Sequence, residues 1–298
     1  MSRLHENPAV NGRVHQYHAD ATVLSGNLHI PLPQKIEPQA KSHLYHQGGY
    51  LSQHATEYRV EGVLSFRRAY SQVAGHPGRK HGHGWATLST TVVEDLNVLE
   101  ILTADRVVGQ IITEHPLDGY VPHVSFLGTR IENLRIAGHP VELEWDLNIL
   151  GTRQENDHAY SKHEGVLEKV KNLLLGMGKA EELPETVTEQ YNRLSSNIGS
   201  PEAVECSLVK QVKGCFPGIP FGHIIRVPDF GTIELAKLSV CHEKFGAPDR
   251  EHNPNPNVPE LTTITLTMID LKLGCAIEGD VPIGVGSSNG GTTKPGGN

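Results

Sequence analysis

The chain has 298 residues, enough to bury a sizeable core as one large domain or two of ordinary size. Its formal net charge is -8 and its Lys and Arg are scattered, which excludes the clustered basic surface of a nucleic-acid-binding protein. The mean hydropathy is -0.33, and no apolar run approaches the ~20 residues that a transmembrane helix needs. The first residues lack the apolar core of a signal peptide, so we expect a cytoplasmic protein, or an extracellular one whose signal has been removed.

The first part of the chain carries a β pattern. Residues 1–20 are polar and contain several histidines, and we predict an N-terminal arm. Between 21 and 150, short apolar segments recur at regular spacing, which is typical of antiparallel strands in a sandwich or barrel. Apolar and acidic residues alternate without error over 141–147, so this strand has one dry and one wet face. We predict that it forms a hairpin with 131–136.

The β pattern is interrupted once, at 151–202. Apolar residues there fall at helical spacing, and Gly176 follows where a helix would end. A weaker helical pattern follows Pro184. We therefore predict a helical hairpin inserted between two β blocks and packed on them. Its packing residues are Val170, Leu173 and Leu174.

The second β block is predicted over 203–285, and the Gly-rich residues 286–298 are predicted to form a flexible tail. Apolar residues occupy even positions up to Met268 and odd positions from Ile269 onward. Because a one-residue slip would expose the whole apolar set, we expect a bulge or a change of face between these two residues. The predicted fold class is mainly β, an antiparallel sandwich or barrel built from two β blocks with an inserted helical hairpin.

Several of these segments resemble a known group of proteins. The segments WATLS at 85–89, LNVLEILTADRVV at 96–108 and IENLRIAGHPV at 131–141 resemble a repeated theme in uncharacterised β-rich bacterial proteins of the "choice-of-anchor" group. The segments 230–236 and 266–274 are similar to the closing strands of such proteins. The resemblance implies a β fold and an extracellular ancestry, and it supplies no catalytic residues. We recognise neither the signal nor the anchor of the group in this sequence, and in that respect the sequence departs from the group's pattern.

The densest group of the 18 histidines comprises His76, His81 and His83. His81 and His83 would point the same way in an extended segment, so both could reach one divalent transition metal. Against this, Ala-Thr-Leu-Ser stands where a cupin-type pattern would place its Glu, and a solvated loop explains the histidines equally well. The pairs His15/His18, His43/His46 and His158/His163 lack a supporting ligand pattern, and we interpret them as surface residues.

Other candidate sites have ordinary structural explanations. Glu142, Glu144 and Asp146 lie on one strand face at a spacing that overlaps glycosidase carboxylates, but an acidic row is also the usual solvent face of a strand. A Gly-x-Ser-x-Gly match at 286–290 has no helix after it and therefore lacks the context of a nucleophile elbow. The four cysteines could form disulfides in three ways, although buried thiols are our preferred interpretation; they are Cys206, Cys215, Cys241 and Cys275.

These observations favour a non-enzymatic binding or assembly protein whose partner is a small molecule or a second copy of the chain. We expect no bound cofactor. The alternative is an enzyme that uses a histidine-held divalent transition metal or a small-molecule cavity closed by the helical hairpin.

Overall fold

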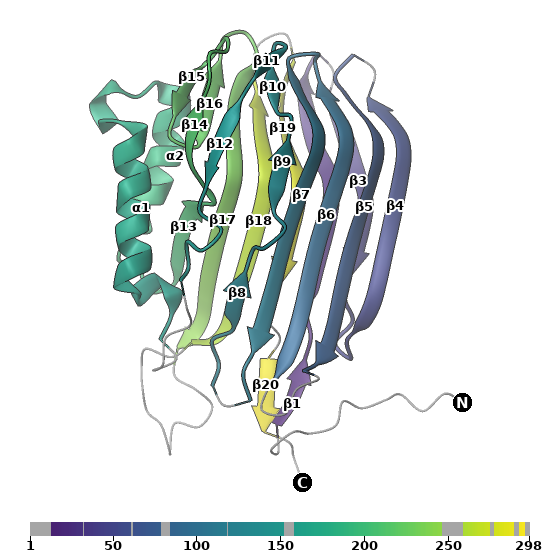
Figure 1. Ribbon diagram of the computed structural model, residues 1–298, viewed down its shortest axis with the longest axis vertical. Helices are drawn as coiled ribbons and strands as arrows, with labels where there is room; N and C mark the ends of the chain where they lie inside the picture. Colours follow the sequence, from purple (N-terminus) through teal and green to yellow (C-terminus); the bar gives the residue numbers. More distant parts are fainter. Residues whose placement is uncertain are drawn as a thin grey trace.

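Two antiparallel sheets lie face to face in the computed structural model, and a helical hairpin flanks one of them (Figure 1). The structure describes residues 13–31, 33–60, 62–78, 84–117, 119–151, 158–245, 259–274, 277–288 and 292–295. The predicted fold class, a mainly β sandwich with one inserted helical hairpin, is confirmed.

The first sheet is dominated by four long strands in sequence order. Short strands extend it beyond β7, where β8, β9 and β10 all pair with β7. Its members are β4 (Gly49–Val60), β5 (Leu64–Pro77), β6 (Trp85–Val98), β7 (Leu102–His115), β8 (His123–Ser125), β9 (Arg130–Glu132), β10 (Arg135–Ile136) and β11 (His139–Pro140).

The second sheet combines strands from both ends of the chain. Its order is β15-β16-β17-β18-β19-β2-β3, with β13 also paired to β17. Its members are β2 (Ala19–Ile30), β3 (Gln34–His43), β13 (Ala203–Ser207), β15 (Ile219–Phe221), β16 (Ile224–Val227), β17 (Gly231–Phe245), β18 (Pro259–Leu273) and β19 (Glu278–Ser288). The predicted block 21–150 is thus divided between the sheets, because β2 pairs with the distant β19.

The chain ends also depart from the prediction. The predicted arm at 1–20 contains β1 (Arg13–Gln16) and the start of β2, and the predicted tail at 286–298 contains the end of β19 and all of β20 (Thr292–Pro295). Strands β1 and β20 pair with each other. Polar composition suggested an arm and a tail because it carries no information about pairing between residues so far apart in sequence.

The predicted hairpin of 131–136 with 141–147 forms only near its turn, where the backbone N–H of Val141 donates to the carbonyl of Leu134 at 2.9 Å. Strand β12 (Glu142–Trp145) pairs instead with β14 (Val209–Lys213), and β10 forms the short hairpin with β11. The acidic side of β12 faces lysine, since Lys213 Nζ lies 2.7 Å from a carboxylate oxygen of Glu144. This ion pair agrees with a solvent face rather than a catalytic pair.

The helical hairpin consists of α1 (Glu164–Met177) and α2 (Glu185–Ser196), preceded by the short 3₁₀ turns Tyr160–Lys162 and Ala180–Glu182. The predicted packing residues Val170, Leu173 and Leu174 are buried, as expected. Helix α1 does not end at Gly176 but continues to Met177, where Gly178 with a φ of 105° terminates it.

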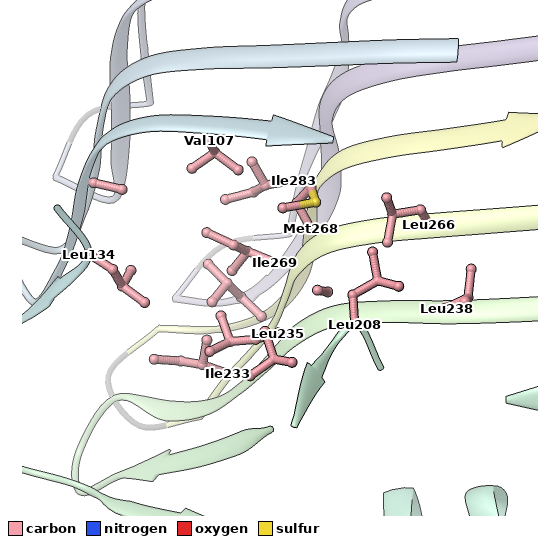
Figure 2. Close-up of a cluster of buried hydrophobic side chains, with 14 of the residues drawn as sticks. Val107, Leu134, Leu208, Ile233, Leu235, Leu238, Leu266, Met268, Ile269 and Ile283 are labelled. Carbon is pink, nitrogen blue, oxygen red and sulfur yellow. The ribbon is translucent and has the colours of Figure 1, made fainter. Parts of the chain in front are cut away.

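The core between the sheets confirms the expected change of face in β18. Leu266, Met268 and Ile269 are all buried, and Figure 2 shows them in one apolar cluster with Ile283 and Val107. The ladder between β17 and β18 omits Ala236 with Met268, and Ala236 has a φ of 46°. The pairing register is the same on both sides of this irregularity, so the two strands change face together there, and apolar side chains stay inside on both sides.

Candidate metal centre

A histidine–carboxylate cluster lies on the outer face of the second sheet, where β2 begins and β3 ends. Ala19 and Ala21 of β2 are fully buried, so His18 and Asp20, which alternate with them, point to the opposite face. His43 of β3 is the direct cross-strand partner of Asp20. Two adjacent strands therefore bring the three side chains together.

The donor atoms of this cluster are close to one another. Nδ1 of His43 lies 2.8 Å from one carboxylate oxygen of Asp20, and Nε2 of His18 lies 3.4 Å from the other. One ligand atom from each residue falls within 4.8 Å of the other two. The side chains are 33%, 34% and 50% exposed for His18, Asp20 and His43, so solvent reaches the cluster.

Two hydrogen bonds hold the backbone that carries these ligands. The hydroxyl of Ser89, from the facing sheet, donates to the carbonyl of Asp20 at 2.7 Å. The backbone N–H of Leu44 donates to the carbonyl of Ala19 at 2.8 Å. The ligand positions are thereby tied to both sheets, which is how a scaffold preorganises a binding site.

Two imidazoles and one carboxylate form a donor set that zinc and other first-row transition metals accept. Metal–ligand bonds of about 2.0–2.2 Å place ligand atoms roughly 3–3.5 Å apart in a tetrahedral site. The contacts of Asp20 with His43 and His18 lie near that range. To bind a metal through Nδ1, His43 would give up the proton that it shares with Asp20, because a coordinating nitrogen needs its lone pair, and the neutral imidazole would carry its proton on Nε2.

The sequence-predicted metal residues do not join this cluster. His76 lies in β5, is exposed, and has Nδ1 at 3.0 Å from the carbonyl of Pro77. His81 and His83 lie outside the described residues, so their proposed metal role stays a prediction. The cluster takes one histidine from each of two pairs that we interpret from the sequence as surface residues, His15/His18 and His43/His46. That interpretation is wrong for His15, which is buried. The useful signal was His18-Ala-Asp20, a spacing that places both side chains on one strand face.

Other histidines in the described part of the chain have structural surroundings. The His15 ring stacks on Trp85 at a centroid distance of 4.6 Å, and both are buried at the end of the sandwich beside Tyr17. His242 has Nδ1 at 3.0 Å from the hydroxyl of Thr262, and its Nε2 accepts the backbone N–H of Ser161 at 3.4 Å. Burial lowers the pKa of His242 to about 4, so this imidazole is neutral at neutral pH.

A second ionic cluster lies on the same sheet but beneath α2. Arg193 of α2 reaches Glu205 at 2.5 Å and Glu234 at 2.6 Å. The fully buried His223 has Nε2 at 3.7 Å from Glu234, too far for a hydrogen bond. Burial by itself would raise the pKa of Glu234, but the facing His223 and the charges of Arg193 and Lys237 outweigh it, and the pKa falls to about 2.

The cysteines only partly match the prediction of buried thiols. Cys206, Cys215 and Cys241 are free, and Cys206 is buried, with a pKa raised by that burial. Cys215 is exposed and Cys241 is half-buried, which corrects the prediction for these two. Cys275 lies outside the described residues.

A cavity of about 270 Å³ lies at the start of α2, away from the histidine–carboxylate cluster. Its charged lining residues are Glu189, Arg226, Asp229 and Lys272, and Glu189 and Lys272 already form an ion pair at 2.8 Å. Because this ion pair neutralises part of the cavity wall, and the lining contains both acidic and basic residues, the cavity favours neither an anionic nor a cationic ligand.

No helix in the described part of the chain is long and apolar enough to span a membrane. Among known families, the model described as "Domain of unknown function (DUF8256)" matches residues 15–241, about three quarters of the chain. This range includes His18, Asp20, His43 and the helical hairpin. No curated protein and no solved structure matches the chain.

Proposed function

We propose that this chain, which belongs to the DUF8256 family, is a binding protein that holds a divalent transition-metal ion through His18, Asp20 and His43. The observation that carries the proposal is the convergence of three donor atoms within 4.8 Å on two hydrogen-bonded strands. Three protein ligands would leave at least one coordination position for water or for a ligand from outside the chain.

Metal binding competes with a simpler arrangement of the same residues. Asp20 can accept a hydrogen bond from His43 and attract a protonated His18 without any metal. Solvent-exposed pairs of this kind contribute little, usually between 0 and about 1 kcal/mol. A metal ion with three ligands contributes far more, so the two arrangements differ in measurable affinity and stability.

The exposure of the cluster supports a binding role over an enzyme. The ligands are one third to one half exposed on an open strand face, whereas small-molecule catalysis generally uses a concave site that excludes water. The proposal therefore keeps the predicted class, a non-enzymatic binding protein, and replaces the predicted ligands.

The test is titration of the tag-free apoprotein with Zn²⁺ and Co²⁺, followed by calorimetry and by the visible absorption of Co²⁺. We expect one ion per chain, and His18→Ala, Asp20→Asn and His43→Ala should each weaken binding by at least about 100-fold, since even outer-shell changes cost 10–100-fold.

A matched control is His29→Ala, which removes a histidine 3.8 Å from Asp280 on the same sheet and should leave binding unchanged. The double variant His81→Ala/His83→Ala distinguishes the proposed site from the sequence-predicted one. Loss of binding in that variant alone, or no binding in the wild type, would refute the proposal.

A further inference from the structure

The edges of the two sheets are unequally protected. Among the described strands, β11 and β15 end one side of each sheet and have only 2 and 3 residues. The opposite edges are β4 with 12 residues and β3 with 10. Figure 1 shows β4 at the outer edge of the front sheet, with β3 behind it. A long edge strand presents unpaired backbone groups to any strand that can reach it.

Strand β3 carries the features that discourage edge pairing. Lys35 and Lys41 place charges on it, and Pro38 removes a backbone donor. Ala40 has a φ of 44°, and the pairing of β3 with β2 shifts register between Ile36 and Gln39. Charge, proline and irregularity are the usual means by which natural sheets block their edges.

Strand β4 has none of these features over its first eight residues. Residues 49–56 contain no charged residue and no proline, and they pair regularly with β5 from Gly49 opposite Gly75 to Thr56 opposite Arg68. The first residue other than glycine with a positive φ in β4 is Glu57, with a φ of 50°. Tyr50 in this segment is 66% exposed. In the described part of the chain, β4 pairs only with β5.

We propose that β4 pairs through residues 49–56 with β4 of a second copy of this chain, in antiparallel orientation across a two-fold axis. An antiparallel strand is its own complement, so both copies contribute the same surface. Eight residues span about 27 Å. Because the segment is uncharged, self-pairing centred on it opposes no like charges, which directly opposite each other would destabilise the pair.

The side-chain arrangement of the segment also fits self-pairing. Leu51 and Ala55 pair with the buried Val73 and Ala69 of β5, which places them on the core side of the sheet. Tyr50 and His54 alternate with them and face outward. A two-fold register that places the core sides of the two copies on the same side joins their first sheets into one continuous sheet. Such a pairing also covers the exposed Tyr50.

The experiment measures molar mass by sedimentation and light scattering across a concentration series at physiological salt. We expect the wild type to approach twice the chain mass of 32.6 kDa. Gln53→Lys/His54→Lys and Gln53→Glu/His54→Glu each place like charges at the centre of the pair, and each variant should be monomeric. An equimolar mixture of the two variants should dimerise again, because opposite charges then meet.

The control is Gln34→Lys/Gln39→Lys, which adds the same charge to the edge strand β3 and should leave the dimer intact. Three outcomes would each overturn the proposal. The first is a wild type that is monomeric at all concentrations, which is the result expected if β4 instead pairs with a strand of another protein. The second is a dimer that persists in Gln53→Lys/His54→Lys. The third is an equimolar mixture of the two variants that stays monomeric.

Discussion

Two clusters of histidine and carboxylate lie at opposite ends of one row of paired residues across the second sheet. The row runs from Asp20 through Ser287, Thr265 and Ser239 to Glu205. At the Asp20 end, His18, Asp20 and His43 are open to solvent. At the Glu205 end, α2 covers the sheet and supplies Arg193 as the counter-ion.

The comparison shows that burial beneath a helix, more than residue type, decides whether such a cluster can bind an external ligand. Beneath α2, the carboxylate of Glu234 is 4% exposed and already bound to a cation, so it has little capacity for an external ligand. On the open face, the carboxylate of Asp20 contacts two histidines, His18 and His43, which can also bind a metal. We therefore expect the covered cluster to contribute to stability and the open cluster to binding.

The largest expected effect is that of Arg193→Met. The change leaves Glu234 buried without its closest cation, and breaking a buried pair in this way typically costs about 3–5 kcal/mol, less where one partner is partly exposed as Arg193 is. Urea unfolding should show this loss of stability as a lower urea concentration at the midpoint of the transition. Lys179→Met, which removes an exposed pair with Glu182, should change the free energy of unfolding by no more than about 0.5 kcal/mol.

The covered cluster should also make the free energy of unfolding depend on pH in the acidic range. The pKa of Glu234 is about 2 in the folded protein and 4.5 in the unfolded chain. Between these values the unfolded chain binds a proton that the folded protein does not, so this contribution is complete above pH 4.5 and is lost as the pH falls toward 2. The loss is about 3 kcal/mol. Urea unfolding of Glu234→Gln over this range should show a shallower pH slope, and an unchanged slope would contradict the assignment.

His242 provides a comparison at higher pH. Its pKa is about 4 when folded and 6.5 when unfolded. The neutral folded form is therefore favoured above pH 6.5, and stability falls by up to about 3 kcal/mol as the pH drops to 4. Thermal unfolding of His242→Gln across this window should have a flatter profile. A profile identical to that of the wild type would show that another group is responsible for the pH dependence in this window.

The open cluster should affect stability only when metal is present. At a free Zn²⁺ concentration of 100 times Kd, the wild type should gain about 2.7 kcal/mol. His18→Ala/His43→Ala should abolish that gain in differential scanning calorimetry. A gain that survives in the double variant would place the ion elsewhere.

The smallest expected effect is that of the same double variant without metal. Side chains that are one third to one half exposed contribute little packing energy, so His18→Ala/His43→Ala should change the free energy of unfolding by no more than about 0.5 kcal/mol. A loss of several kcal/mol measured by urea unfolding in chelator would show that the open cluster is structural, and the contrast with the covered cluster would disappear.

The sequence by itself determined those features that depend on neighbouring residues. Alternation identified the β class and the wet face of β12, and helical spacing identified α1 with its buried Val170 and Leu173. The change of parity at Met268 and Ile269 was readable because burial of one strand face imposes a period of two.

Only the tertiary structure decided which distant segments meet. Pairing of β2 with β19 and of β12 with β14 depends on backbone hydrogen bonds between residues far apart in sequence, which no local pattern encodes. His43 becomes a partner of Asp20 through strand register, and Arg193 meets Glu234 because α2 folds back over the sheet. Composition drew attention to the loop with the most histidines, whereas a binding site requires donors that the fold brings within a few ångströms.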